Sequence, residues 1–321
     1  MDIILSHKSA LEYWRLQGNA KTTGFVIHRR KKPPASLPNP TAICEVAPPG
    51  LSYPIDLMVS SQTARRRSKI VRPRVYTGPT PDGCFISIGG GLPVSTPQFC
   101  FFQMAGELPL VKLIELGFEL CGSYSISPAG EYSPGVESAD KTLYGHPPLT
   151  STKAIKSLIT RLEGVNGQKK ADRALRYIAD GSASPMETII IMLLTLPHKL
   201  GGYGLPMPEL NRRIDSENAA KWGSRRYYYI CDLFWPKANI AIEYDSDFYH
   251  AGADRMDSDS TKRLDLTTHD INVLTVTNRK LRNPAIIESI AKLIAKRLGI
   301  RLRYENPQFL EARRELRNLL L

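Results

Sequence analysis

Apolar residues form the clearest pattern in the last 140 residues of the chain. Ser184 and Pro185 suit the first positions of a helix, and the following METIIIMLLTL is apolar on every side, which predicts a buried helix. Two apolar strands follow at 227–234 and 238–244, with the sequence Trp-Pro-Lys between them as the turn. The pattern therefore predicts a helix followed by a β-hairpin.

Three further elements follow this hairpin. We expect a helix at about 257–269, a buried strand at 272–277 (NVLTVT) and an amphipathic helix at 285–298. The order α-β-β-α-β, closed by this last helix, predicts an α/β domain with a mixed sheet.

The first half of the chain mixes short strands and helices. Strands are expected at 3–5, within 53–76, and at 85–88 and 92–94 around a Gly-Gly-Gly turn, with helices after Ser6, near Pro97 and at 110–120. We therefore predict a smaller α+β domain at 1–122. A Gly-, Pro- and Ser-rich linker at 123–150 and a helical connector at 151–183 would join it to the C-terminal domain at 184–321.

Positive charge is concentrated near the N-terminus. The net charge is +12, and residues 1–80 hold 13 Lys or Arg against 4 Asp or Glu. This indicates a surface that faces a polyanion, although a solvated basic face or arm is the alternative. The expected nucleic-acid-binding residues are Arg65, Arg66, Arg67, Lys69, Arg72 and Arg74. The connector is also basic, which suits either a DNA-facing or a linking element.

Cysteine content and apolar run lengths narrow the class of protein. The five cysteines are odd in number and never form CxxC, which argues against a disulfide framework and a zinc site. The longest apolar run, at 189–196, is too short to cross a bilayer, and the opening residues do not resemble a signal peptide. We expect a cytoplasmic protein with no membrane partner.

Three carboxylates carry the candidate chemistry. Asp232 and Glu243 fall on the two strands of the hairpin, and Glu187 falls in the first turn of the apolar helix. Carboxylates on core strands need a partner, and Mg²⁺ takes one or two carboxylates together with water and phosphate oxygens. A salt bridge is the alternative for Asp232 and Glu243, and helix-dipole complementarity is the alternative for Glu187.

The segments SPMET, CDLFWPKANIAIEYDSDFYH, DSTKR and NVLTVT carry a resemblance. Residues 184–277 resemble the PD-(D/E)xK nuclease superfamily, and within it the endonuclease family related to very-short-patch-repair enzymes. The resemblance implies a restriction-endonuclease-like core in which Glu187, Asp232 and Glu243 are catalytic and bind Mg²⁺, with Mn²⁺ able to substitute. Asp245 and His250 match the aspartate and histidine that follow in the family.

One position departs from the superfamily pattern. The lysine expected two residues after the glutamate is replaced by Asp245, and the closer family implies a compensating basic residue on the next helix, here Lys262 or Arg263. Lysine suits the orientation of the attacking water better than arginine. Asp245 would be a second metal ligand or lie at the mouth of the site. His250 would be a general base or metal ligand, or simply exposed.

A second, narrower resemblance concerns the N-terminal half. VSTPQFCFFQMAGELPLVKLIELG is similar to the segment that precedes such nuclease domains in proteins whose N-terminal regions resemble abortive-infection antitoxins. The expected function is a metal-dependent DNA endonuclease in phage defence or DNA processing. The alternative is a non-catalytic DNA-binding regulator or antitoxin on a nuclease-like scaffold. RNA as substrate, and a homodimer or partner protein, are left open.

Overall fold

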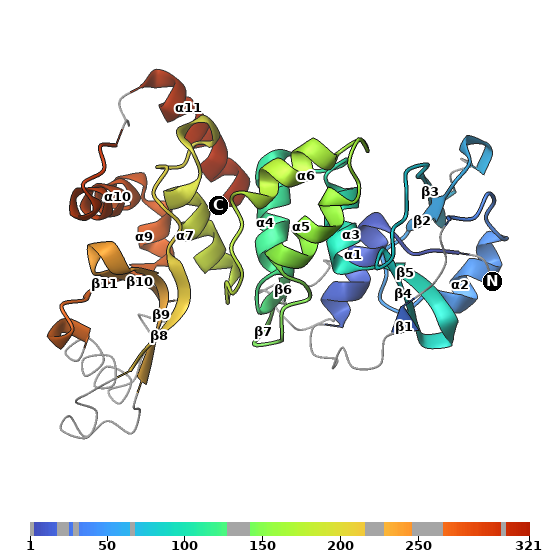
Figure 1. Cartoon of the computed structure of the whole chain (residues 1–321), viewed down its shortest axis with the longest axis horizontal. Helices are drawn as coiled ribbons and strands as arrows, with labels where there is room; N and C mark the ends of the chain where they lie inside the picture. Colours follow the sequence, from blue (N-terminus) through green and yellow to red (C-terminus); the bar gives the residue numbers. More distant parts are fainter. Residues whose placement is uncertain are drawn as a thin grey trace. The chain divides into compact units, whose positions relative to one another are not determined.

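The computed structural model describes residues 3–17, 26–27, 32–64, 68–126, 142–215, 228–245, 266–302 and 306–321. The chain divides into two compact units, Met1–Asp180 and Gly181–Leu321. In Figure 1 the first unit runs from blue to green and the second from yellow-green to red. Within the described ranges, no helix is both long enough and apolar enough to span a membrane.

A mixed four-stranded sheet forms the centre of the second unit. Its order is β11-β10-β9-β8, from strands β8 (Glu209–Asp215), β9 (Tyr228–Trp235), β10 (Ile240–Asp245) and β11 (Asn272–Thr277). β8, β9 and β10 pair antiparallel, whereas β10 and β11 run parallel. The expected hairpin is therefore present, with its turn at η4 (Pro236–Ala238).

The sequence pattern missed β8 entirely. Its residues are half-exposed or exposed, because β8 is an edge strand and much of its side-chain surface faces solvent. An apolar pattern is absent there, so the sequence predicted no strand in this segment. β11 has the predicted bounds, but only Val276 and Thr277 are buried in it, since it forms the opposite edge. Of the helix expected at 257–269, only the end from Leu266 lies within the described residues.

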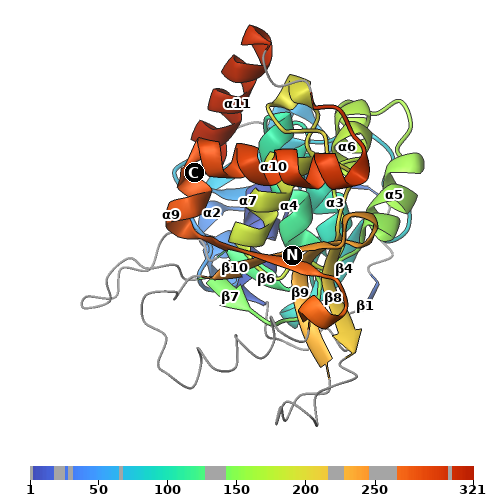
Figure 2. The ribbon, with the colours of Figure 1, turned by 90° about the vertical axis from the view of Figure 1, so that its left-hand side faces the viewer.

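Helices α7 (Pro185–Thr195) and α10 (Pro284–Leu298) pack against each other and lie on the same side of this sheet (Figures 1 and 2). Ser184 caps α7 and Asn283 caps α10 through side-chain oxygens that accept backbone N–H groups, as the sequence predicts for α7. The short helix α9 (Asn278–Arg282) and the terminal helix α11 (Pro307–Leu320) were not expected.

Contact with α11 depends on the absence of a side chain at Gly201. This residue ends the turn η3 (His198–Leu200) with φ +86°, and a Cβ there would lie 2.3 Å from the carbonyl oxygen of Ala312 on α11. Only glycine allows both the left-handed backbone and this close approach. Arg313 adds hydrogen bonds to the Tyr203 hydroxyl and to Glu288, both 2.7 Å.

The N-terminal segment 3–5 connects two groups of strands in the first unit. Leu5 bridges both β2 (Ile55–Val59) and β5 (Leu92–Ser95), and Ile3, Ile4 and Leu5 are fully buried. β2 pairs parallel with β3 (Val71–Val75). β5 pairs with β4 (Phe85–Ile88), which pairs with β1 (Val26–Ile27). A separate pair joins β6 (Tyr124–Ile126) to β7 (Thr142–Tyr144).

Helices complete the first unit. They are α1 (His7–Leu16), α2 (Pro40–Val46), α3 (Pro97–Met104), α4 (Leu110–Leu120), α5 (Thr152–Thr160) and α6 (Gln168–Leu175). α5 and α6 pack against α3 and α4, so these connector helices are part of the same compact unit. Trp14 lies in the core and donates to the Ser95 carbonyl at 2.8 Å. An α+β arrangement is observed, as expected.

Candidate functional site

Asn211, Asp232, Glu243 and Thr275 lie on the four neighbouring strands of the mixed sheet. The last β9–β10 pair joins Ile242 to Leu233, and Glu243 and Asp232 are the next residues of the two strands beyond it. Glu243 pairs with Thr275 on β11, and on β8 Asn211 lies between Leu210 and Arg212, which pair with Leu233 and Cys231. Each of the four strands thus contributes one polar residue to this part of the sheet.

The Asp232 carboxylate is built into the hairpin. Its Oδ2 accepts a hydrogen bond from the backbone N–H of Tyr244, at 2.8 Å. This side-chain contact lies just beyond the last β9–β10 pair at Ile242 and Leu233. Asp232 and Glu243 are both half-buried, whereas Cys231, Leu233 and Ile242 beside them are fully buried. The two carboxylates therefore lie where the closely packed part of the sheet opens.

Glu187 is held in a capping box at the start of α7. Its Oε1 accepts from the Ser184 hydroxyl (2.9 Å) and its Oε2 from the Ala183 N–H (2.9 Å), while the Glu187 N–H donates to the Ser184 hydroxyl oxygen (3.1 Å). Glu187 is only 7% exposed. Burial raises the pKa of Glu187 above the ordinary glutamate value, against the opposing effect of these donors.

Asn211 connects Glu187 to the sheet. Its Nδ2 donates to Glu187 Oε2 at 3.2 Å and to the Gly181 carbonyl at 2.8 Å. Its backbone has φ +48°, a left-handed conformation that asparagine tolerates better than most residues. Sequence reasoning missed this residue. The only available signal was an asparagine inside a polar segment between two apolar elements.

The remaining expected site residues divide into two groups. Asp245 ends β10 opposite Thr277 and is half-buried, so it lies two residues beyond Glu243 on the same strand. His250, Lys262 and Arg263 lie outside the described residues. Their predicted roles stay predictions.

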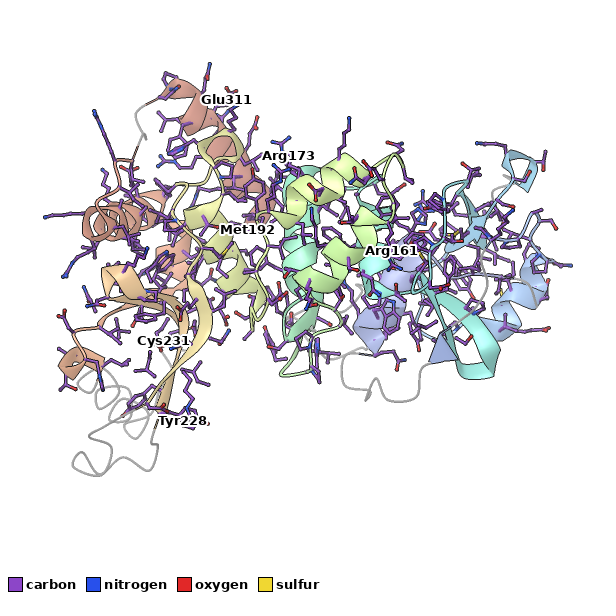
Figure 3. The ribbon with its side chains drawn as sticks, viewed as in Figure 1. Arg161, Arg173, Met192, Tyr228, Cys231 and Glu311 are labelled. Atoms are coloured by element: carbon purple, nitrogen blue, oxygen red, sulfur yellow. The ribbon has the colours of Figure 1, made fainter. Side chains whose placement is uncertain are left out.

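A two-stranded ribbon extends from the site. β9 pairs with β8 from Tyr228 to Phe234, but it pairs with β10 only from Leu233 onward. Within the described residues, 228–232 of β9 and the facing part of β8 therefore form an antiparallel ribbon without a third strand. Tyr228 is the first residue of β9, and Cys231 lies nearer the part of the sheet where β9 also pairs with β10 (Figure 3). The Arg213 guanidinium lies 4.0 Å from the centre of the Tyr228 ring. Tyr228 and Arg213 thus form an exposed aromatic and cationic surface on the β8–β9 ribbon.

The carboxylate oxygens of this site meet part of what a hard cation requires. Asp232 and Glu243 provide two carboxylates on adjacent strands, which is the number that Mg²⁺ takes from a protein. Both Glu187 oxygens already accept hydrogen bonds, and Oε2 accepts two. Among the described residues, no group of three or more His, Cys, Asp or Glu side chains could hold a metal ion. The described chain therefore offers a pair of carboxylates together with a third that is held by the protein.

Two of the expected nucleic-acid-binding arginines lie in an ion-pair network. Asp56, fully buried, accepts from Arg72 Nε at 2.5 Å and from Arg74 Nε at 2.9 Å. Arg74 also pairs with Glu107 at 2.9 Å. Lys69 is exposed, and Arg65, Arg66 and Arg67 lie outside the described residues. Much of the charge of Arg72 and Arg74 is thus balanced within the protein.

His7 borders the same network. The backbone N–H of His7 donates to Gln103 Oε1 (3.0 Å), and the ring Nδ1 lies 3.0 Å from the Ser6 hydroxyl. Burial, followed by the charge of Arg74, lowers the pKa of His7 to about 3, although Asp56 acts in the opposite direction. The imidazole is therefore neutral at physiological pH.

Comparison with known proteins gives no relative. No protein family profile, curated protein or solved structure matches this chain.

Proposed function

We propose that the second unit is a metal-dependent endonuclease that hydrolyses DNA phosphodiester bonds, in phage defence or DNA processing. The observation that carries the proposal is that Asp232 and Glu243 lie on adjacent strands, β9 and β10, next to the last pair of their ladder, with the Asp232 carboxylate fixed by the Tyr244 N–H. Two carboxylates on neighbouring strands, one of them fixed by the backbone, suit a divalent cation.

The order of elements supports the same proposal. α7 precedes three antiparallel strands, and β11 then adds parallel to β10 after the segment that ends at Leu266. We propose that this is the restriction-endonuclease-like core. It contains one more strand, β8, than the sequence pattern suggested, and β8 supplies Asn211.

Each carboxylate has a distinct task in this proposal. Asp232 and Glu243 would hold Mg²⁺ or Mn²⁺, which supplies a polarised phosphoryl oxygen and a more acidic bound water. Glu187 would complete the site through Oε1, which accepts one hydrogen bond from the protein. Asn211 and Ser184 would fix the orientation of Glu187.

The remaining residues act around the phosphate. Asp245 would be a second metal ligand or lie at the mouth of the site, and Lys262 or Arg263 would orient the attacking water in place of the missing lysine. His250 would act as a general base or a metal ligand. In the reaction, a water oxygen attacks phosphorus, the bond to one ester oxygen breaks, and that oxygen is protonated as it leaves.

A second function is favoured by one specific feature. Asp245 stands where the superfamily lysine is expected, and a site that has lost this cation could retain the scaffold for binding alone. The alternative is therefore a non-catalytic DNA-binding regulator or antitoxin.

Cleavage assays with the full chain separate the two functions. Supercoiled plasmid, linear duplex, single strands and RNA are incubated with Mg²⁺, Mn²⁺ or EDTA, using wild type, Asp232→Asn and Glu243→Gln. Asparagine at 232 keeps an oxygen that can accept from Tyr244, so charge changes while the hydrogen bond is retained. We expect metal-dependent cutting of DNA that falls by about 100-fold or more in both variants.

The control is Glu209→Gln, which neutralises an exposed carboxylate on β8 of the same sheet. It should cut as fast as wild type. Duplex binding with no cutting of any substrate under any metal condition would reject the nuclease and favour the regulator.

A further inference from the structure

We propose that the α5–α6 hairpin of the first unit binds the phosphate backbone of duplex DNA, an inference that rests on DNA being the proposed substrate. The surface consists of Lys169 and Arg173 on α6 and Arg176 at its C-cap, together with the loop Gly164 to Gly167. It belongs to the helical connector, whose role the sequence left open between DNA binding and linkage.

The basic residues of α6 lie on one side of the helix. Lys169, Arg173 and Arg176 are spaced i, i+4 and i+7, and all three are exposed, while Ala171 and Ala174 face the core. Arg173 stands on α6 in Figure 3. A rise of 1.5 Å per residue spreads the stripe over about 10 Å. Each DNA strand carries a charge every 3.4 Å of axis, so the stripe spans about three phosphates.

The charges of this stripe are largely unbalanced. Within the described part of the chain, Lys169 and Arg173 form no ion pair. Asp172 is shared between Lys156 and Arg176, with the Arg176 contact at 3.3 Å. From 151 to 180 the chain holds seven Lys or Arg against three Asp or Glu. This differs from the N-terminal arginines, since Arg72 and Arg74 surround a fully buried Asp56.

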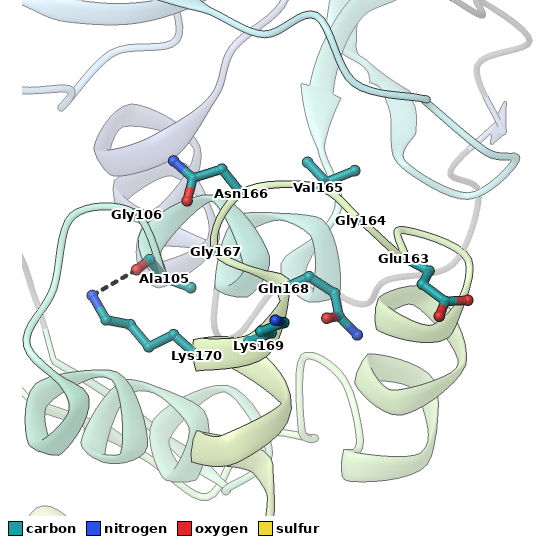
Figure 4. Close-up of a pocket in the computed structure, with 10 residues that line it drawn as sticks. All are labelled: Ala105, Gly106, Glu163, Gly164, Val165, Asn166, Gly167, Gln168, Lys169 and Lys170. Carbon is teal, nitrogen blue, oxygen red and sulfur yellow. Dashed lines mark hydrogen bonds between the residues drawn. The ribbon is translucent and has the colours of Figure 1, made fainter.

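A pocket of about 630 Å³ lies at the start of the stripe, between the α5–α6 loop and the end of α3 (Figure 4). Lys169, Asn166 and Gln168 line it, and Glu163 is the one acidic side chain among its lining residues. Lys170 is turned back, because its Nζ donates to the carbonyls of Ala105 and Leu108, each at 2.9 Å. This anchor fixes the loop against α3.

The loop contributes backbone groups as well as side chains to the pocket. Gly164 and Gly167 have φ +79° and +91°, and a Cβ on Gly164 would meet no atom within 4 Å. Gly167 precedes α6 and has no side chain to cap its first N–H groups. Together with the cationic stripe, this gives a phosphate both hydrogen-bond donors and positive charge.

Binding measurements with the intact chain test the proposal without requiring catalysis. A labelled 30-bp duplex is titrated in EDTA at salt concentrations from 50 to 200 mM, with wild type and Lys169→Glu/Arg173→Glu. We expect binding to weaken by about ten-fold or more at low salt. The slope of log K against log salt should fall by about two, since two phosphate contacts are lost.

The matched control reverses two exposed cations elsewhere, as Lys296→Glu/Arg314→Glu on α10 and α11. It makes the same change in net charge and should alter binding by less than about two-fold. Thermal melting of each variant reports folding. Should the reversal variant be unfolded, Lys169→Gln/Arg173→Gln replaces it, with a smaller loss and the same change in slope expected.

The outcomes separate this proposal from the nuclease proposal. Equal weakening by both double variants, unchanged binding in the α6 variant, or binding of RNA but not of duplex DNA would each overturn the assignment of this surface. Duplex binding through α6 without cleavage by wild type would reject the nuclease and leave the binding surface intact.

Discussion

Asn211 Nδ2 donates to Glu187 Oε2 at 3.2 Å, which ties the first turn of α7 to strand β8. The neighbours of Asn211, Leu210 and Arg212, pair with Leu233 and Cys231 on β9, which flank Asp232. One amide therefore ties the buried helix glutamate to the edge strand of the sheet. Glu187 thereby has a structural role in capping α7 and a proposed role in the site, and these can be separated.

Glu187→Gln and Ser184→Ala should have opposite effects. Glutamine at 187 can retain the capping box, so we expect little change in the free energy of unfolding but a loss of cleavage of about 100-fold. Ser184→Ala removes the cap and should lower the free energy of unfolding by about 1 kcal/mol. Its loss of cleavage should be much smaller than that of Glu187→Gln, because the Ala183 N–H and Asn211 still hold the Glu187 carboxylate. Urea titration and initial rates measure both. Normal cleavage by Glu187→Gln would restrict Glu187 to capping.

Asp56→Ala should destabilise the first unit strongly. The substitution leaves Arg72 and Arg74 without their buried partner, and breaking such a network costs about 3 kcal/mol. Chemical denaturation gives the free energy of unfolding. Asp215→Asn, which breaks an exposed pair with Arg213, should change it by less than about 1 kcal/mol. Similar small effects in both variants would mean that the Asp56 network contributes little.

His7 should make stability depend on acid pH. Its folded-state pKa of about 3 lies below the ordinary value of 6.5, so the unfolded chain binds the extra proton first. The contribution of His7 is fully present above pH 6.5 and is lost as the pH falls toward 3. His7→Asn, which suits the φ of +49°, should reduce this slope.

Two measurements check the His7 prediction. Denaturation between pH 4 and 7 compares the slopes of wild type and His7→Asn. NMR titration of the ring, assigned by its disappearance in the variant, should find a neutral imidazole at pH 5. A ring that titrates near pH 6.5 would contradict the prediction.

Gly201→Ala should loosen the contact with α11. The new Cβ would meet the Ala312 carbonyl at 2.3 Å on a left-handed backbone, so we expect a loss of about 3 kcal/mol. Gly299→Ala is the matched control, because Gly299 has φ +68° but nothing lies within 4 Å of its Cβ position. It should cost only about 1 kcal/mol, from backbone strain alone. Equal melting temperatures for the two variants would contradict the close contact.

Apolar spacing was sufficient where an element is buried on most sides. Helix α7 and the hairpin β9–β10 were predicted from it, since Ile190, Cys231 and Ile242 need a core in any compact arrangement. Spacing failed at β8. A solvent-facing edge strand is stabilised by its backbone pairing with β9, and this pairing leaves little trace in side-chain character.

The sequence by itself determined which residue types were present: three carboxylates at 187, 232 and 243, and basic residues near the N-terminus and on α6. Tertiary structure decided what those charges face. It placed Asp232 and Glu243 on adjacent strands, tied Glu187 to Asn211, and balanced Arg72 and Arg74 with Asp56 while Lys169 stayed exposed. The reason is physical: the effect of a charge depends on its burial and partners, and these come from segments distant in sequence.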